Sequence, residues 1–200
     1  GAGLHLALAE RAAAKSGVMD AVDAVRVANN ELRRLSTLVS DFLEFARPNP
    51  AVLARVDVPT LCKRAAGEVE NLAASRGVKI ALDFPAQRLE LDLDAKKVEQ
   101  VVLHLIENAV EAARGAVTIR VRRQPTHAAI DVEDDGIGLP EPDAPIFDAF
   151  YSTKPEGTGL GLAIVQRVIA EHGGEVSVER RAGRTCFRLT LPLIREGKKP

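Results

Sequence analysis

The chain has 200 residues, of which 46% are hydrophobic and 28% are charged, and its net charge is −1. This balance is ordinary for one or two soluble globular domains, and it argues against a nucleic-acid-binding protein. Aromatic residues make up 4% of the chain and tryptophan is absent, so a stacking platform for single strands is not expected. No apolar run has the length of a membrane span, so a membrane anchor is expected only in segments outside this chain.

The two cysteines, Cys62 and Cys186, lie in amphipathic stretches without CxxC or Cys/His spacing. Such a pattern favours buried, reduced thiols over a disulfide framework or a metal site. We therefore expect a cytoplasmic domain, whose parent protein could still be anchored in a membrane.

Residues 1–50 predict a helical hairpin. An Ala- and Leu-rich helix covers residues 4–15, and apolar residues then recur at three- and four-residue steps from 20 to 46, before a proline-rich stretch. One hairpin buries its apolar stripe poorly, so we expect two chains to form a dimeric four-helix bundle. Packing of the hairpin onto its own chain is the alternative.

Residues 51–200 predict a second domain. The periodicity predicts helices and strands in turn: helices at 59–76, 95–114 and 161–172, and strands at 78–84, 89–93, 116–123, 127–133, 175–181 and 185–193. Strands grouped around three helices indicate an α+β fold, an α/β sandwich in which a mixed, mostly antiparallel sheet carries three helices on one face.

Two glycine clusters in this domain indicate a nucleotide pocket. They are Asp134–Gly138 (DDGIG) and Gly157–Leu162 (GTGLGL), and the second runs into an apolar-periodic helix. Glycine lets the backbone approach a ligand, and a glycine turn that opens a helix presents free N–H groups to phosphate. A strand that ends in Asp134 can direct a carboxylate at a donor on a base. The segment between the clusters is predicted to be a lid.

The preceding helix carries polar side chains on an otherwise apolar surface. His104 and Asn108 are four residues apart and share a face, and Glu107 and Glu111 form a second row. Magnesium bound to phosphates needs only a few protein oxygens, and one amide oxygen from Asn108 meets that demand. Alone, these rows would suit an ordinary solvated helix face better than a binding site, but the glycine clusters downstream favour the binding site.

Together these motifs resemble the sensor histidine kinases of two-component systems, within the wider group of gyrase-, Hsp90- and MutL-like (GHKL) ATPases. Gln100–Ala112 resembles the N box, the two glycine clusters resemble the glycine boxes, and Ile146–Lys154 resembles the F box of the lid. Glu31–Pro48 resembles the second helix of the dimerisation hairpin. Four motifs in this order are far more specific than a single glycine motif.

The resemblance implies a role for each matching residue. Asn108 would ligate Mg²⁺, Asp134 would accept a hydrogen bond from the adenine amino group, and Gly136 and Gly138 would let the backbone pass beneath adenine. The end of the lid would contact the ATP phosphates through Lys154, Gly157, Thr158, Gly159, Leu160 and Gly161. Phe147 and Phe150 would anchor the lid.

The candidate catalytic residues are His104, Glu107 and Lys154, and Glu111 is a further candidate for cofactor binding. Two positions depart from the family pattern. His104 stands where the family usually has asparagine, and Asp135 replaces another common asparagine, which would add a negative charge at the pocket mouth.

The resemblance implies a transferase that moves the γ-phosphoryl of ATP to a histidine and then to an aspartate of a response regulator receiver domain, leaving ADP. The usual phosphoacceptor motif is not recognisable, because His5 is followed by Leu-Ala-Leu. We therefore predict that the chain binds Mg·ATP without labelling itself. His127 and His172 are expected at the surface or at helix ends.

The sequence is compatible with two other functions. One is a nucleotide-binding regulatory or scaffold protein that has no acceptor and acts through dimerisation. The other is an ATP-hydrolysing machine of the gyrase or Hsp90 type, which is disfavoured because those proteins place a glutamate at the position of His104.

Overall fold

The computed structural model describes residues 50–139, 144–154 and 157–193, together with isolated helical residues between 25 and 39. The predicted hairpin, its dimer contacts and His5 otherwise lie outside the described residues. The chain divides into two compact units, one of residues 49–149 and 161–200 and the other of residues 1–48 and 150–160, and each is described by itself.

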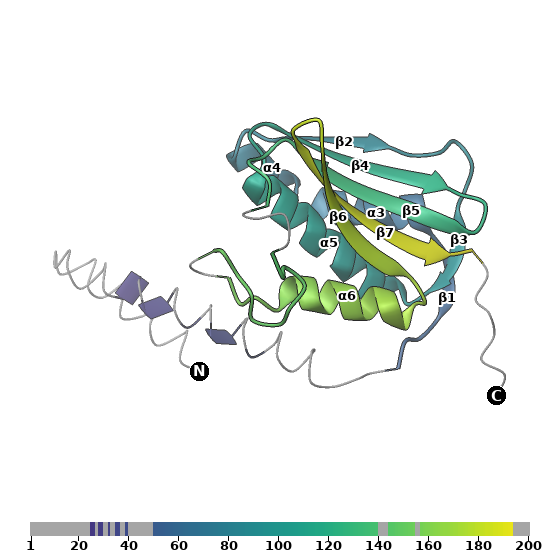
Figure 1. The fold of residues 1–200 in the computed structure, drawn as a ribbon, viewed down its shortest axis with the longest axis horizontal. Coiled ribbons are helices and arrows are strands. Elements are labelled where there is room, and N and C mark those ends of the chain that lie inside the picture. Colours follow the sequence, from purple (N-terminus) through teal and green to yellow (C-terminus); the bar gives the residue numbers. More distant parts are fainter. Residues whose placement is uncertain are drawn as a thin grey trace. The chain divides into compact units, whose positions relative to one another are not determined.

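A five-stranded sheet forms the larger unit, with strand order β2-β4-β5-β7-β6 (Figure 1). Its strands are β2 (Lys79–Asp83), β4 (Ala116–Arg123), β5 (His127–Asp134), β6 (Glu175–Arg181) and β7 (Arg184–Pro192). Only β2 and β4 run parallel, and every other neighbouring pair is antiparallel. The predicted mixed, mostly antiparallel sheet is therefore confirmed.

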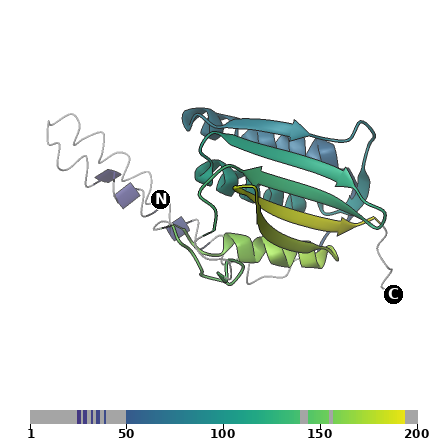
Figure 2. The same cartoon turned by 45° about the horizontal axis from the view of Figure 1, so that its top comes forward.

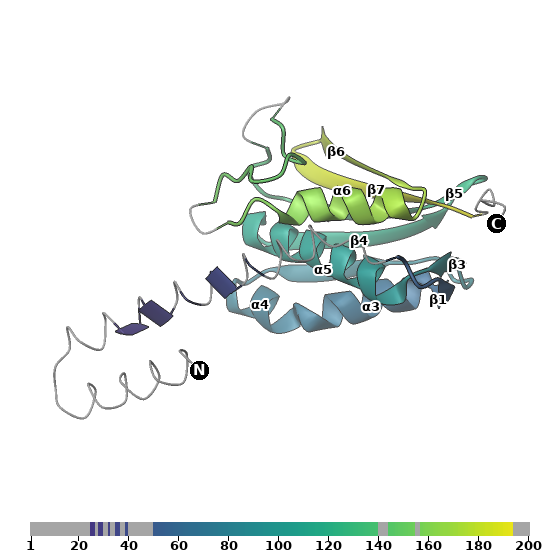
Figure 3. The ribbon, with the colours of Figure 1, turned by 90° about the horizontal axis from the view of Figure 1, so that it is seen from below.

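Helices cover one face of this sheet, as Figure 3 shows, and Figure 2 gives a second view of the same two layers. They are α3 (Val58–Glu68), α4 (Glu70–Ser75), α5 (Ala95–Ala112) and α6 (Gly161–Glu171). The prediction of three helices was wrong, because the expected helix over 59–76 breaks at Val69. Gly67 weakens the helix just before the break, and the chain turns so that Val69, only 2% exposed, enters the core.

A second, two-stranded sheet was not predicted. Strand β1 (Ala54–Asp57) pairs antiparallel with β3 (Glu90–Leu93), so β3 does not join the main sheet. Asp57 joins this ribbon to α3, since its carboxylate accepts the Thr60 N–H at 3.3 Å as a helix cap and the Leu89 N–H at 3.1 Å. Proline-rich flanks had indicated only a domain boundary in this part of the sequence.

The core lies between the helices and the helix-facing side of the sheet. Alternation along β4 places Val117, Ile119 and Val121 in this core at 0% exposure, and turns arginines to the other face. On that face Arg120 pairs with Glu133 at 2.7 Å. Charge thus covers the side that no described helix shields.

Both cysteines are buried and free, as the sequence predicted. Burial raises the pKa of the Cys62 thiol to about 12 and that of the Cys186 thiol to about 11, so both stay protonated. Among the described helices, none combines the length and the apolar character needed to cross a bilayer.

Candidate functional site

Asp134 is the last residue of β5 and is almost fully buried, with 2% of its surface exposed. Its Oδ1 accepts the backbone N–H of Gly136 at 2.8 Å. Burial raises the pKa of this carboxyl above its usual value, and the negative charge of Asp135 acts in the same direction. The Gly136 N–H and the positive charge of Arg180 oppose the rise. The strand end thus holds a buried carboxylate with an acceptor oxygen to offer a ligand.

The turn after Asp134 requires glycine at two positions. A Cβ on Gly136 would overlap the carbonyl oxygen of Ala112, at the end of α5. Gly138 has a φ of +90°, and a Cβ there would overlap the guanidinium of Arg180. That guanidinium also donates a hydrogen bond to the Ile137 carbonyl. The turn is therefore held between α5 and β6, and only glycine allows so close an approach.

Asp135 has a structural role that the sequence reading missed. Its Oδ1 accepts three consecutive backbone N–H groups, those of Arg114 at 2.8 Å, Gly115 at 3.1 Å and Ala116 at 3.1 Å. Asp135 therefore fastens the loop between α5 and β4 to the end of β5. Its charge does act on Asp134, but the side chain is committed to this loop rather than open to a ligand.

The predicted polar residues lie in the C-terminal half of helix α5, and His104 among them lies against the start of α6. His104 and Asn108 are half-buried one turn apart, Glu107 is half-buried, and Glu111 is exposed. Helix α6 begins at Gly161, where an added Cβ would overlap the imidazole of His104. The first turn of α6, whose N–H groups have no acceptor within the helix, thus lies next to the face of α5 that carries His104.

These residues fit a magnesium ion that a nucleotide brings with it. The described residues contain no cluster of three His, Cys, Asp or Glu side chains that could hold a metal alone. Asn108 would offer its amide oxygen to such an ion, and phosphate oxygens and water would supply the other ligands.

The described lid residues are divided between the units, with residues 144–149 in the larger unit and 150–154 in the smaller one. Phe150 has a φ of +69° and its N–H donates to the Gly159 carbonyl at 2.9 Å. Gly159 has a φ of +70°, and a Cβ there would overlap the backbone of Phe150. Phe150 is 63% exposed, whereas Ile146, in the larger unit, is buried at 7%. The two ends of residues 150–159 are thus fastened through backbone atoms.

Side-chain hydroxyls fasten the same segment locally. The Ser152 Oγ accepts the Lys154 N–H and donates to the Lys154 carbonyl, both at 3.1 Å. The Thr158 Oγ1 accepts the Leu160 N–H at 3.3 Å. The Lys154 side chain is exposed.

The predicted site residues therefore fall into two sets. Those in the larger unit come from α5, the β5 turn and the start of α6: His104, Glu107, Asn108, Glu111, Asp134, Gly136, Gly138 and Gly161. Those in the smaller unit are Lys154, Gly157, Thr158, Gly159 and Leu160.

Thr185 is a site residue that the sequence reading did not single out. It lies directly opposite Asp134 in the β5–β7 register and is 3% exposed. Within the described residues its Oγ1 has no hydrogen bond of ordinary geometry, although its hydroxyl slightly lowers the pKa of Asp134. The sequence did hold a signal, since Thr185 is the polar member of the alternating series that continues with Phe187, Leu189 and Leu191.

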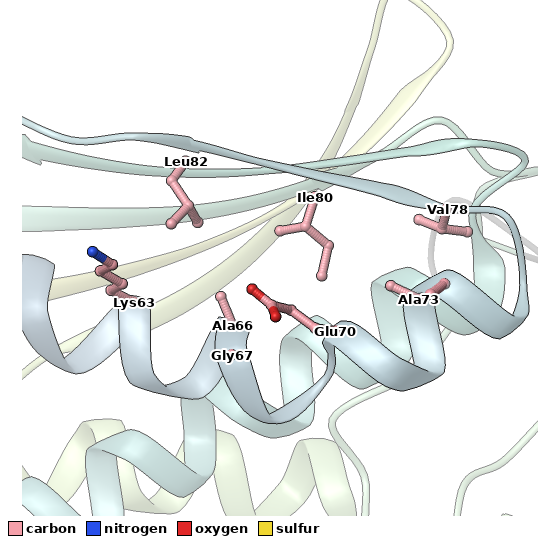
Figure 4. A pocket seen from close by; sticks show the side chains of 9 residues that line it. Lys63, Ala66, Gly67, Glu70, Ala73, Val78, Ile80 and Leu82 are labelled. Carbon is pink, nitrogen blue, oxygen red and sulfur yellow. The ribbon is translucent and has the colours of Figure 1, made fainter.

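A separate groove of about 340 Å³ opens between α3, α4 and β2 (Figure 4). Its lining mixes small and apolar residues with two opposite charges, Lys63 and Glu70. None of the residues predicted for the nucleotide site lines it.

His172 lies at a helix end, which is one of the two places expected for it. It does follow the last residue of α6, but it is not at the surface, because only 1% is exposed. Its ring bonds to backbone atoms at both nitrogens: Nδ1 lies 2.7 Å from the Val168 carbonyl oxygen and Nε2 accepts the Asp94 N–H at 3.0 Å.

The sequence profile of the family described as "Histidine kinase-, DNA gyrase B-, and HSP90-like ATPase" matches residues 93–195. The sensor histidine kinase MtrB of Mycobacterium bovis is 36% identical over 182 residues, which cover 84% of this chain and 32% of MtrB. The sensor histidine kinase ZraS of Escherichia coli is 33% identical over 203 residues, which cover 99% of this chain and 43% of ZraS. The chain thus spans less than half the length of these relatives.

Solved structures agree with this assignment. Full-length ShkA in complex with AMPPNP is similar with a TM-score of 0.75 and 32% identity, over 86% of this chain and 38% of ShkA. The catalytic domain of histidine kinase ThkA is similar with a TM-score of 0.67 and 27% identity, over 71% of this chain and 96% of that domain. The chain therefore belongs to the histidine kinase-, DNA gyrase B- and HSP90-like ATPase family and carries the ATP-binding catalytic domain of a sensor histidine kinase.

Proposed function

We propose that this domain binds Mg·ATP at the turn after β5 and donates the γ-phosphoryl group to a histidine. The observation that carries the proposal is the buried Asp134, whose carboxylate lies beside two glycines that would let the backbone pass close to a planar ligand. Burying a carboxylate costs free energy unless its oxygens accept hydrogen bonds, so a donor on the ligand, such as the adenine amino group, would complete the hydrogen bonds of Asp134. The Thr185 hydroxyl adds a second polar atom to this subsite.

The other end of the nucleotide is assigned to α5 and α6. Asn108 would hold Mg²⁺, which neutralises the charge that develops on the phosphate oxygens. His104 offers an imidazole N–H to a phosphate oxygen, and Glu107 and Glu111 are the nearby carboxylates. The first turn of α6 supplies N–H groups and the positive end of the helix dipole.

The glycine turn that precedes α6 in the sequence is assigned to the phosphates by family resemblance. Its residues would contribute backbone N–H groups, and Lys154 would contribute charge. Support comes from the resemblance and from the continuity of Gly157–Leu160 with α6.

In the transfer, a histidine ring nitrogen attacks the γ-phosphorus while the bond to the β–γ bridging oxygen breaks, and ADP leaves with the electron pair. An aspartate carboxylate of a receiver domain then takes the phosphoryl group from the histidine nitrogen in a second substitution. The residues of this domain act by binding and orienting the nucleotide rather than by covalent chemistry.

The decisive experiment is calorimetric titration of the chain with Mg·AMPPNP. Asp134→Asn and Asn108→Ala are each expected to weaken binding by about tenfold or more, since each removes a bond to the ligand or its metal. Asp92→Asn, which alters an exposed carboxylate on β3, is the matched control and should bind as the parent does. Unchanged binding in both site variants would show that the site is wrongly assigned.

The histidine and the partners are a separate part of the proposal. The relatives named above are sensor histidine kinases, which favours a kinase over an acceptor-less scaffold. We propose a homodimer through the N-terminal helices and a receiver domain as the second acceptor. With γ-labelled ATP, this chain is expected to show no acid-labile label, and a label that disappears in His5→Ala would contradict that expectation. Light scattering tests the dimer.

A further inference from the structure

Asp94 joins three parts of the domain. Its Oδ1 accepts the Lys97 N–H at 3.2 Å and so caps α5, while its Oδ2 accepts the Val52 N–H at 3.0 Å from the segment that enters the domain. Its own N–H donates to the His172 Nε2 at 3.0 Å, just beyond α6. We name Val52, Asp94, Lys97, Glu171 and His172 the Asp94 junction.

The junction is held by charge as well as by these bonds. Lys97 Nζ and Glu171 Oε2 lie 2.8 Å apart, with only 19% and 27% of their side chains exposed. Burial by itself would raise the pKa of Asp94, but the N–H groups of Val52 and Lys97 bring it below the usual value. Asp94 is therefore charged at neutral pH and accepts on both oxygens.

The bonds of His172 leave one arrangement of its protons. The Val168 carbonyl can only accept, so Nδ1 carries the proton and Nε2 is free to accept from Asp94. The ring thus works as a rigid spacer between the end of α6 and the start of α5.

Helices α5 and α6 run antiparallel, and they also meet at the proposed nucleotide site. Asp94 and His172 meet at one end of the pair, and His104 and Gly161 meet at the other. At a rise of 1.5 Å per residue, the junction is about 20 Å along α5 from Asn108. Packed helices transmit small displacements as rigid bodies, so a shift of α5 on α6 at the junction also moves His104 relative to Gly161 at the other end.

We infer that the Asp94 junction couples the segment around Val52 to nucleotide affinity. While the Val52 N–H is bonded, the junction fixes the register of α5 on α6, and His104 is held beside the first turn of α6 with Asn108 one turn further along α5. When that segment is displaced, the Asp94 side chain loses one of its two anchors, the register loosens, and ATP is bound more weakly. The inference rests on the proposed function, and it assigns Val52, Asp94 and His172 as positioning residues.

The backbone of Val52 can be tested almost separately from its side chain, because 78% of that residue is exposed. Val52→Pro removes the N–H donor and is expected to raise the Kd for Mg·AMPPNP about three- to tenfold. Val52→Ala keeps the N–H, and Ala51→Pro places a proline in the same segment without removing it, so both should bind within about twofold of the parent. A merely local, structural role for this bond would lower the unfolding temperature and leave the Kd unchanged.

Coupling is reciprocal, which gives a second measurement on the unmodified chain. Saturation with Mg·AMPPNP should slow hydrogen exchange at the amides of Val52 and Asp94 by a factor similar to the affinity loss of Val52→Pro. Should Val52→Pro fold poorly, this exchange experiment decides alone.

The outcomes separate the two proposals. If the parent chain fails to bind Mg·AMPPNP, the proposed function is wrong. If the parent binds, Asp134→Asn does not, and Val52→Pro matches the parent, then only the junction is wrong. Equal exchange rates for Val52 and Asp94 with and without nucleotide would also overturn the junction.

Discussion

Asp135 allows the sharpest prediction about stability, because a single oxygen accepts three backbone N–H groups at 2.8 to 3.1 Å. Asp135→Ala leaves all three without that acceptor. Hydrogen bonds to a charged group are each worth about 1.5–3 kcal/mol. These three share one oxygen of a half-buried residue, and water can bond the N–H groups once that oxygen is removed, so we expect a total loss of about 2–3 kcal/mol. Asp135→Asn keeps an acceptor oxygen and should lose only about 1 kcal/mol.

Urea unfolding measures this loss directly. With a slope of about 2 kcal/mol per molar urea, the midpoint of Asp135→Ala should fall by about 1 M, and that of Asp135→Asn by about half as much. A midpoint for Asp135→Ala within about 0.3 M of the parent would refute the reasoning, because this oxygen would then contribute little to folding.

The pH dependence of unfolding checks the same carboxylate. Burial alone would raise the pKa of Asp135, but the N–H groups of Ala116, Gly115 and Arg114 hold it below the usual value. Its contribution is therefore complete above the ordinary carboxyl pKa of about 3.9 and is lost as the pH falls through the lower pKa of the folded state. The stability difference between the parent and Asp135→Asn should accordingly shrink in acid.

Two further predictions concern the nucleotide site. Gly161→Ala places a methyl group against the His104 ring and should lower the free energy of unfolding, measured with urea, by about 1–3 kcal/mol. Most of this loss should disappear when Gly161→Ala is made in a chain that also carries His104→Ala. Equal losses with and without His104→Ala would count against the contact. Burial raises the pKa of Asp134, and its ionised carboxylate is the form that accepts a hydrogen bond from the adenine amino group most strongly. AMPPNP binding should therefore weaken as the pH falls, and it should do so at a higher pH than an ordinary carboxyl group would cause. Calorimetry from about pH 4 to 7 checks this, and a constant Kd over that range would contradict it.

Local pattern predicted most of the secondary structure. The strands β4 and β5 and the helices α5 and α6 were expected close to their observed bounds, because each buries a regular series of apolar side chains against one layer. The break at Val69 escaped prediction, since both halves of the expected helix keep the same apolar period.

The site was predicted only as far as its residue types allowed. Asp134 and Gly136 were identified because a carboxylate at a strand end and a glycine turn suit a nucleotide whatever surrounds them. The roles of Asp135 and His172 depend on backbone groups 19–21 and 78 residues away along the chain, and no local pattern contains such partners.

The sequence by itself determined the family, the order of the elements and the glycine turns, because each of these depends on side-chain period and on residues close together in the chain. Only the tertiary structure decided that β1 pairs with β3, that Thr185 faces Asp134, and that Asp94 joins Val52 to His172. These contacts join chain segments far apart in sequence, and their partners are chosen by packing of the whole domain rather than by local preference.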